Sequence, residues 1–198
     1  MKEFWNERYA KNEFIYGTEP NEFFRKELEI LPAGKIILPC DGEGRNAVFA
    51  AKLGWQVNAF DFSPSAKEKA KALAKKEGVN PVYDVADIIE KEFKENSADV
   101  VALIYAHFPV ELRKIAHQKA IKWLKPGGKL ILEAFNPKQL GNDSGGPKNI
   151  EMLYSEDLLR EDFKDLKFEK LEILETNLSE GNYHDGKADI IRMVATKA

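Results

Sequence analysis

The segment at residues 40–47, with the sequence CDGEGRNA, contains residue types that can bind a nucleotide-like cofactor. It follows a short apolar run, Lys35 to Leu38, and precedes a helical pattern that ends at Gly54. Glycines at such a strand-to-helix turn let the backbone approach a ligand closely, and the free N–H groups favour an anionic group. The glycine and alanine spacing, G-x-G-x-x-A, also satisfies the dinucleotide fingerprint. The alternative interpretation is a tight turn without a ligand.

Asp61 is the second candidate, at the end of the next apolar run, Gln56 to Phe60. Its distance from the glycine segment is about that at which such folds place an acid on a ribose. A carboxylate can accept hydrogen bonds from both ribose hydroxyls. Alternatively, Asp61 is an acid near the start of a helix capped by Ser63.

Two acids in the glycine segment, Asp41 and Glu43, bear on the choice of cofactor. Carboxylates beside a pyrophosphate repel it unless they turn away. S-adenosylmethionine has no phosphate and carries a sulfonium and an ammonium, so it suits these acids better than a nicotinamide dinucleotide. The chain length also leaves no room for a separate substrate domain after the sheet. We therefore expect S-adenosylmethionine.

Short apolar runs alternate with helical patterns, which predicts parallel strands joined by crossover helices. Thr18 is expected to cap a first helix, and Ser63, Pro64 and Gly78 mark the start and end of a later one. Two β-like runs close the chain and can pair as an antiparallel hairpin. The predicted fold is α/β: a Rossmann-like, doubly wound, mostly parallel seven-stranded sheet with helices on both faces and a C-terminal antiparallel hairpin. The helix expected after Thr18 covers residues 19–30, later helices 110–124 and 155–163, and the strands 35–38, 56–60, 81–85, 99–105, 129–135, 168–177 and 188–196.

Composition limits the other function classes. The 198 residues suit one domain, expected over 1–198, with residues 1–34 as a helical cap over the cofactor site. The net charge is −3 and the basic residues are dispersed, so no nucleic-acid partner is expected. We find no signal peptide and no apolar stretch that could cross a bilayer, so we expect a cytoplasmic protein with no membrane partner. One cysteine and three scattered histidines give no metal-ligand spacing.

The three histidines receive different interpretations. His107 follows the run 99–105, where the carboxyl edge of a parallel sheet forms a crevice, so it is a candidate base; a structural role is the alternative. His184 lies in the loop of the closing hairpin, where a solvated side chain is preferred over a substrate contact. His117 is expected on a helix surface. The loop 136–149 is either a lid on the substrate side or a plain connection.

The order of these motifs resembles that of class I S-adenosylmethionine-dependent methyltransferases. The resemblance rests on the glycine segment, Asp61, the run 82–87 and the segment 124–133, LKPGGKLILE, and extends from about residue 34 to the end. The beginning, W-N-x-R-Y at residues 5–9 followed by Y-G-x-x-P at residues 16–20, resembles the branch with tellurite-resistance and thiopurine methyltransferases.

The resemblance implies a set of cofactor-binding residues. The backbone of the glycine segment lines the methionine part, Asp61 holds the ribose, and Asp87 meets the adenine amino group. Tyr105 faces the sulfonium side, where it and His107 are the catalytic candidates, and the segment around Tyr16 covers the cofactor. The complete set is Tyr16, Cys40, Asp41, Gly42, Gly44, Arg45, Asn46, Asp61, Phe62, Ser63, Asp87, Ile88 and Tyr105.

The glycine segment also departs from the family pattern. The family usually has an acid at the Leu38 position and glycine at the Cys40 position, and Pro39 removes a backbone donor. Asp41 is a candidate substitute for the missing acid. The expected function is methyl transfer to a small-molecule acceptor, with a soft nucleophile such as a thiolate or selenolate as one class. The alternatives are a nicotinamide-dependent oxidoreductase and a non-catalytic cofactor-binding protein of the same fold.

Overall fold

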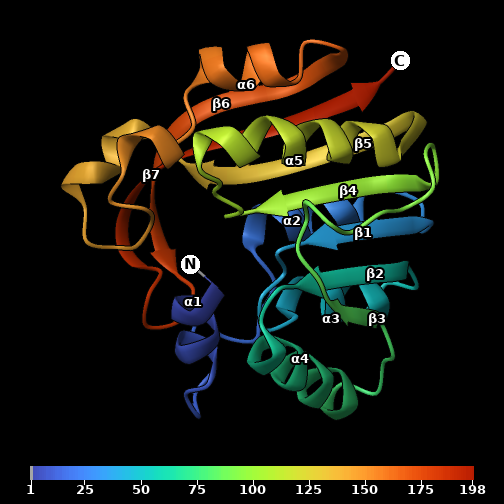
Figure 1. Ribbon diagram of the computed structural model, residues 1–198, viewed down its shortest axis with the longest axis vertical. Helices are drawn as coiled ribbons and strands as arrows, with labels where there is room; N and C mark the ends of the chain where they lie inside the picture. The colour runs from blue at the N-terminus through green and yellow to red at the C-terminus, as the bar shows by residue number, and fades with distance from the viewer. Residues whose placement is uncertain (1) are drawn as a thin grey trace.

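One seven-stranded sheet organises the molecule, in the strand order β3-β2-β1-β4-β5-β7-β6. The computed structural model describes residues 2–198 (Figure 1). The five strands from β3 to β5 run parallel, and β7 is antiparallel to both β5 and β6. This arrangement confirms the predicted fold class. The strands are β1 (Lys35–Pro39), β2 (Gln56–Asp61), β3 (Val82–Val85), β4 (Ala98–Ile104), β5 (Leu124–Phe135), β6 (Leu166–Ser179) and β7 (Asp185–Lys197).

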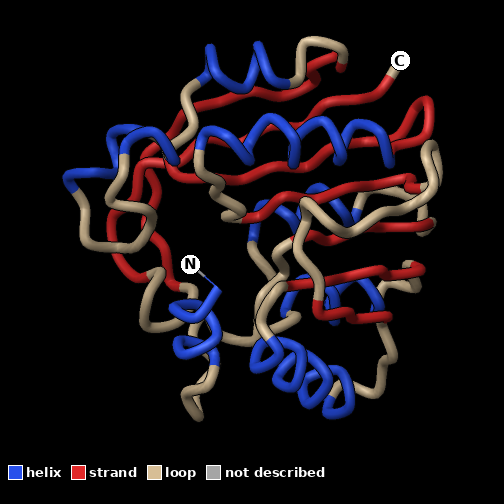
Figure 2. Tube along the Cα trace, in the orientation of Figure 1, coloured by secondary structure: helices blue, strands red, loops and turns tan. Residues whose placement is uncertain are grey.

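Helices cover both faces of the sheet (Figure 2). Alternate residues of a strand point to opposite faces, and β1 shows this clearly: Ile37 joins one core, and Ile36 and Leu38 join the other. The first core lies under α5 and α6, and the second under α2, α3 and α4. The helices are α1 (Lys2–Tyr9), α2 (Glu22–Glu29), α3 (Arg45–Lys52), α4 (Pro64–Lys76), α5 (Val110–Trp123) and α6 (Glu156–Asp162), with short 3₁₀ turns η1 (Pro137–Gly141) and η2 (Ile150–Met152).

Several predicted boundaries differ from the structure by a few residues, and two of the differences have a clear cause. Helix α2, which was expected to begin after Thr18, is capped by Asn21, whose side chain accepts from the backbone N–H of Phe24 at 2.9 Å. Tertiary contacts hold Asn21 in place, because its own N–H donates to the Asn46 side chain at 3.0 Å. Strand β5 begins at Leu124 and not at Lys129, since Leu124 already pairs with Ala98 before a bulge. In residues 2–198 no helix is both long and apolar enough to span a bilayer.

Candidate active site

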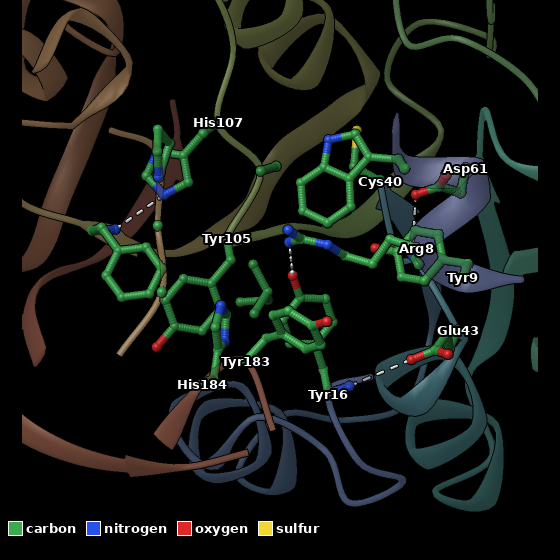
Figure 3. A pocket seen from close by; sticks show the side chains of 18 of the residues that line it. Arg8, Tyr9, Tyr16, Cys40, Glu43, Asp61, Tyr105, His107, Tyr183 and His184 are labelled. Carbon is green, nitrogen blue, oxygen red and sulfur yellow. Dashed lines mark hydrogen bonds between the residues drawn. The ribbon is translucent and has the colours of Figure 1, made fainter. Parts of the chain in front are cut away.

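A cavity of about 660 Å³ lies at the carboxyl ends of β1, β2, β4 and β5 (Figure 3). Each of these strands delivers its last residue or the one that follows to the wall: Cys40, Asp61, Tyr105 and Phe135. Ligands of doubly wound α/β sheets bind at this edge. The volume is within the range of about 300–1,000 Å³ that is typical of small-molecule sites.

The glycine segment has the backbone that a close-approach loop requires. Cys40, Gly42 and Gly44 all have left-handed φ angles, of 54°, 58° and 86°. Cys40 therefore keeps the backbone conformation that glycine adopts readily, although it carries a side chain. Gly44 has a packing role, since a Cβ there would lie 2.5 Å from the Cβ of Ala70 on α4. Leu38 is buried in the core under α2 and α3, away from the cavity.

Asp61 lies beside this loop, as the adjacent positions of β1 and β2 dictate. Its carboxylate accepts from the backbone N–H of Gly42 at 3.2 Å and of Ser63 at 2.9 Å. Burial raises its pKa to about 6, while these N–H groups oppose the rise. At neutral pH the side chain is therefore mostly ionised. A carboxylate has about four acceptor sites, so capacity remains for hydroxyl donors of a ligand.

The two acids of the glycine segment, Asp41 and Glu43, are not both available to a ligand as unpaired negative charges. Glu43 accepts from the N–H of Ile15 at 2.7 Å and pairs with Lys69 at 2.7 Å. Asp41 accepts from the N–H of Ala47 in α3 at 3.3 Å, and burial raises its pKa to about 8. The two acids therefore present less negative charge to a cofactor than the sequence indicated.

Helix α1 and the segment after it form one wall of the cavity. The Asn6 side chain accepts from the Ser63 hydroxyl at 2.8 Å and the Ser65 N–H at 3.1 Å, and Lys2 pairs with Asp87 at 3.0 Å. These contacts fix α1 to the start of α4 and to the loop after β3. The wall residues are Phe4, Trp5, Arg8, Tyr9, Tyr16 and Gly17.

The opposite wall contains His184, whose side chain was predicted from the sequence to be exposed to solvent. His184 is only 5% exposed, and its ring packs between Tyr16 and Tyr105, with centroid distances of 4.5 and 4.4 Å. The prediction of a solvated loop histidine is wrong, because the hairpin folds this residue against the sheet edge. Tyr105 itself has a left-handed φ of 51° at the end of β4.

The other two histidines hold the structure together. His107 lines the cavity, but its Nδ1 donates to the carbonyl of Met152 at 2.6 Å and its Nε2 accepts from the N–H of Phe135 at 3.1 Å. Burial lowers its pKa to about 4. Because both ring nitrogens of His107 form hydrogen bonds with the backbone, this geometry favours a structural role over that of a base. His117 is fully buried and bonded to Asp162 at 2.8 Å, so its predicted surface position is wrong.

Ten of the residues suggested by the sequence line the cavity. They are Tyr16, Cys40, Asp41, Gly42, Arg45, Asn46, Asp61, Phe62, Tyr105 and His107. Gly44, Ser63, Asp87 and Ile88 lie outside its wall. The Ser63 hydroxyl accepts from the N–H of Ala66 as the cap of α4, and Ile88 is a core residue. Asp87 is turned to Lys2.

Sequence reasoning did not select Arg8, Trp5 or Glu180. Arg8 donates to the Tyr16 hydroxyl at 3.2 Å, and its guanidinium lies 4.9 Å from the Trp5 ring centroid. The W-N-x-R-Y sequence was a signal for the first two, but it indicated only a resemblance. Glu180 had no signal, since its partner Arg45 is distant in the chain.

Comparisons with known proteins indicate a methyltransferase domain. Residues 40–132 match the methyltransferase domain family. A 2-heptyl-1-hydroxyquinolin-4(1H)-one methyltransferase of Mycobacteroides abscessus is 29% identical over 141 residues, covering 68% of this chain and 60% of that protein. The probable S-adenosyl-L-methionine-dependent methyltransferase TehB of Haemophilus influenzae is 26% identical over 167 residues, covering 79% and 54%. The chain thus spans little more than half the length of these relatives.

Solved structures give the same fold. TehB from Haemophilus influenzae aligns with a TM-score of 0.73 at 18% identity, covering 100% of this chain and 67% of that one. A structure concerned with conversion of a disulfide bond into a thioacetal group during echinomycin biosynthesis aligns at 0.80 with 16% identity, covering 100% and 91%.

A glycine loop and an acid at the carboxyl edge of a parallel sheet define a Rossmann-like cofactor-binding protein. The family match over residues 40–132 and the relatives above support a class I S-adenosylmethionine-dependent methyltransferase near the TehB branch.

Proposed function

We propose that this protein binds S-adenosylmethionine in the cavity and transfers its methyl group to a small-molecule acceptor. The observation that carries the proposal is one continuous cavity with two different ends. The glycine loop and Asp61 form one end, and Tyr105, Phe135 and His184 form the other. A methyltransferase needs both ends, since the cofactor and the acceptor must meet in line.

The residues at the first end fit the cofactor. A Cβ at Gly42 would lie 2.8 Å from the Tyr9 hydroxyl, so only a bare backbone is accommodated between β1 and α1. The Gly42 backbone with Cys40 and Asp41 would flank the methionine part, and Asp61 would accept from the ribose hydroxyls. Phe62 would pack on the adenine.

Residues 2–17 would act as a lid over this end, as part of the cap expected over residues 1–34. Asp87 would reach the adenine only if the Lys2–Asp87 pair opens, whereas Ile88 stays in the core. The lid therefore has to move at its N-terminal end before the cofactor is fully enclosed.

When bound, the cofactor supplies an activated methyl group on a sulfonium. The protein has to align the acceptor with that carbon and exclude water. The rings of Tyr16 and Tyr105 pack on either side of His184, and aromatic walls of this kind exclude water. A thiolate or another soft nucleophile would need no more than this alignment.

Isothermal calorimetry tests the cofactor. We expect micromolar binding of S-adenosylmethionine and S-adenosylhomocysteine and none of NADH. Binding of NADH alone would favour the oxidoreductase alternative. Tight binding of S-adenosylmethionine without product from a panel of phenols, thiols and hydroxyquinolones would favour a non-catalytic cofactor-binding protein.

A further inference from the structure

His184 occupies a defined place in the acceptor end of the cavity (Figure 3). It lies in the turn between β6 and β7, and its side chain is 7% exposed. Besides the flanking tyrosines, its ring contacts Phe135 edge-on, with a centroid distance of 5.2 Å. Packing on three sides fixes the plane of the imidazole, so the ring cannot turn freely.

A carboxylate sets which nitrogen carries the proton. Nδ1 of His184 lies 3.4 Å from Oε2 of Glu180, and the same oxygen accepts from Arg45 at 2.8 Å. Burial by itself would raise the pKa of Glu180, but its bonds with His184 and Arg45 bring that pKa down to about 2. Glu180 is therefore ionised and acts only as an acceptor. The proton of a neutral His184 is thus held on Nδ1, and Nε2 carries the lone pair.

Nε2 is the nitrogen that remains for a bound molecule. Across residues 2–198, no protein group forms a hydrogen bond with it, whereas both nitrogens of His107 are occupied. Gly145 lies against the same edge of the ring: a Cβ there would be 2.7 Å from Cδ2 and 3.3 Å from Nε2. A side chain at this position would therefore press on the Nε2 edge, and only glycine fits there.

We propose that His184 is the catalytic base that removes the proton of the acceptor, and that the acceptor is an aromatic hydroxyl. The inference rests on the proposed methyl transfer. In this step the X–H proton moves to Nε2 and the freed electron pair of X forms the bond to the methyl carbon. The electrons of the breaking carbon–sulfur bond return to sulfur, and the proton is later released to water. Glu180 is a positioning residue that holds the ring and its tautomer.

The surroundings support both parts of this proposal. Tyr105 and Phe135, whose ring centroids are 4.7 Å apart, form an aromatic wall against which a flat acceptor can stack. The charged and titratable groups around His184 are Glu180, Arg45, Arg8, Tyr16, Tyr105 and His107. Burial lowers the pKa of His184, against the effect of Glu180, so the ring is neutral and able to accept a proton at physiological pH.

A series of phenols that differ in acidity tests the base. A phenol with a pKa near 10 has to lose its proton during methylation, whereas a nitrophenol is already ionised at pH 8. With His184→Gln we expect kcat/KM to fall by about 100-fold or more for the weakly acidic phenol. For the ionised nitrophenol we expect a change of less than about threefold, because no base is needed. Thiophenols, which are also largely ionised, serve as the soft-nucleophile comparison. An equal loss across the series would overturn the proposal, as would no loss.

Three controls distinguish loss of the base from loss of the fold and from failure of the proposed methyl transfer. Affinity for S-adenosylhomocysteine and the melting temperature of His184→Gln should stay close to those of the wild type. Added imidazole should restore part of the phenol methylation to His184→Ala. If the wild type binds no S-adenosylmethionine, the proposed function itself fails; if it methylates phenols and His184→Gln does so equally well, only the role of His184 fails.

The tautomer can be measured without turnover. The chain has three histidines, so ¹⁵N resonances of the imidazoles can be assigned by loss of one set in His184→Gln. We expect Nε2 of His184 to be unprotonated at pH 7.5 and to shift when 4-nitrophenol binds. A protonated Nε2 with a bare Nδ1 would contradict the proposal.

Discussion

Replacement of Asp61 by asparagine should weaken cofactor binding by a predictable amount. The carboxylate is 5% exposed and accepts from the N–H groups of Gly42 and Ser63. The proposed ribose contacts would add donors to the same charged group. Loss of hydrogen bonds to a charged group costs about 1.5–3 kcal/mol. The dissociation constant of S-adenosylhomocysteine should therefore rise by about tenfold to about 100-fold in Asp61→Asn.

The pH dependence of binding gives an independent check. Burial raises the pKa of Asp61 to about 6, with the backbone donors opposing the shift. Hydroxyl donors prefer the ionised form, so affinity should fall as the pH drops below about 6, approaching about tenfold per pH unit. The asparagine variant has no such group and should lose this component of the pH dependence. The effect on folding stability has the opposite sign. Because the pKa of Asp61 is raised in the native state, the native state binds the proton more readily than the unfolded chain. The contribution of Asp61 to the free energy of unfolding therefore falls as the pH rises from about 4 to about 6.

Calorimetric titrations from pH 5 to pH 8 measure both effects. Asp84→Asn is the matched control, because Asp84 is an acid on the neighbouring strand β3 that pairs with Lys91 outside the cavity wall. Its substitution should leave the affinity within about twofold of the wild type. Equal affinity of Asp61→Asn and wild type at every pH would refute the assignment of Asp61 to the ribose.

Substitutions at four further positions test the structural roles. His107→Gln should lower the melting temperature but leave the pH profile of methylation unchanged, since both ring nitrogens bond to the backbone; a displaced profile would restore His107 as a base. Cys40→Val should be about 1–3 kcal/mol less stable than Cys40→Gly in urea unfolding, because φ at this position is 54°; equal stabilities would contradict the claim of backbone strain. Asp162→Asn should cost about 3–5 kcal/mol in the same assay, because Asp162 bonds to buried Arg113 and His117 at 2.8 Å each. His117→Gln should reduce the loss of stability below pH 6.5: burial lowers the pKa of His117, so the unfolded chain takes up the proton first.

Most of the sheet could be predicted from the sequence because its signals are local. A parallel strand covered on both faces is an apolar run, and β4 shows this over residues 100–104. Ser63 and Pro64 marked the start of α4 for an equally local reason, as a side-chain cap and a residue with a fixed φ. The prediction that Thr18 caps α2 was wrong, because both Thr18 and Asn21 are residue types that can cap a helix. A contact with Asn46, distant in the chain, selects Asn21.

The cofactor end of the site was also accessible to sequence reasoning. Consecutive strands β1 and β2 lie side by side and parallel, so their carboxyl ends place the glycine loop next to Asp61. The sequence thus determined the fold class, the family resemblance and this pair of features.

The acceptor end depended on the tertiary structure. Glu180 is 135 residues from Arg45, and only the return of the β6–β7 hairpin beside β5 brings that pair and His184 to the cavity. The burial of His117 similarly required α6 to pack on α5. Local periodicity reports which face of an element is apolar, but it does not report which distant segment will cover that face. The sequence by itself therefore determined the sheet and the cofactor loop, whereas long-range packing decided that His184 lines the cavity at the proposed acceptor end.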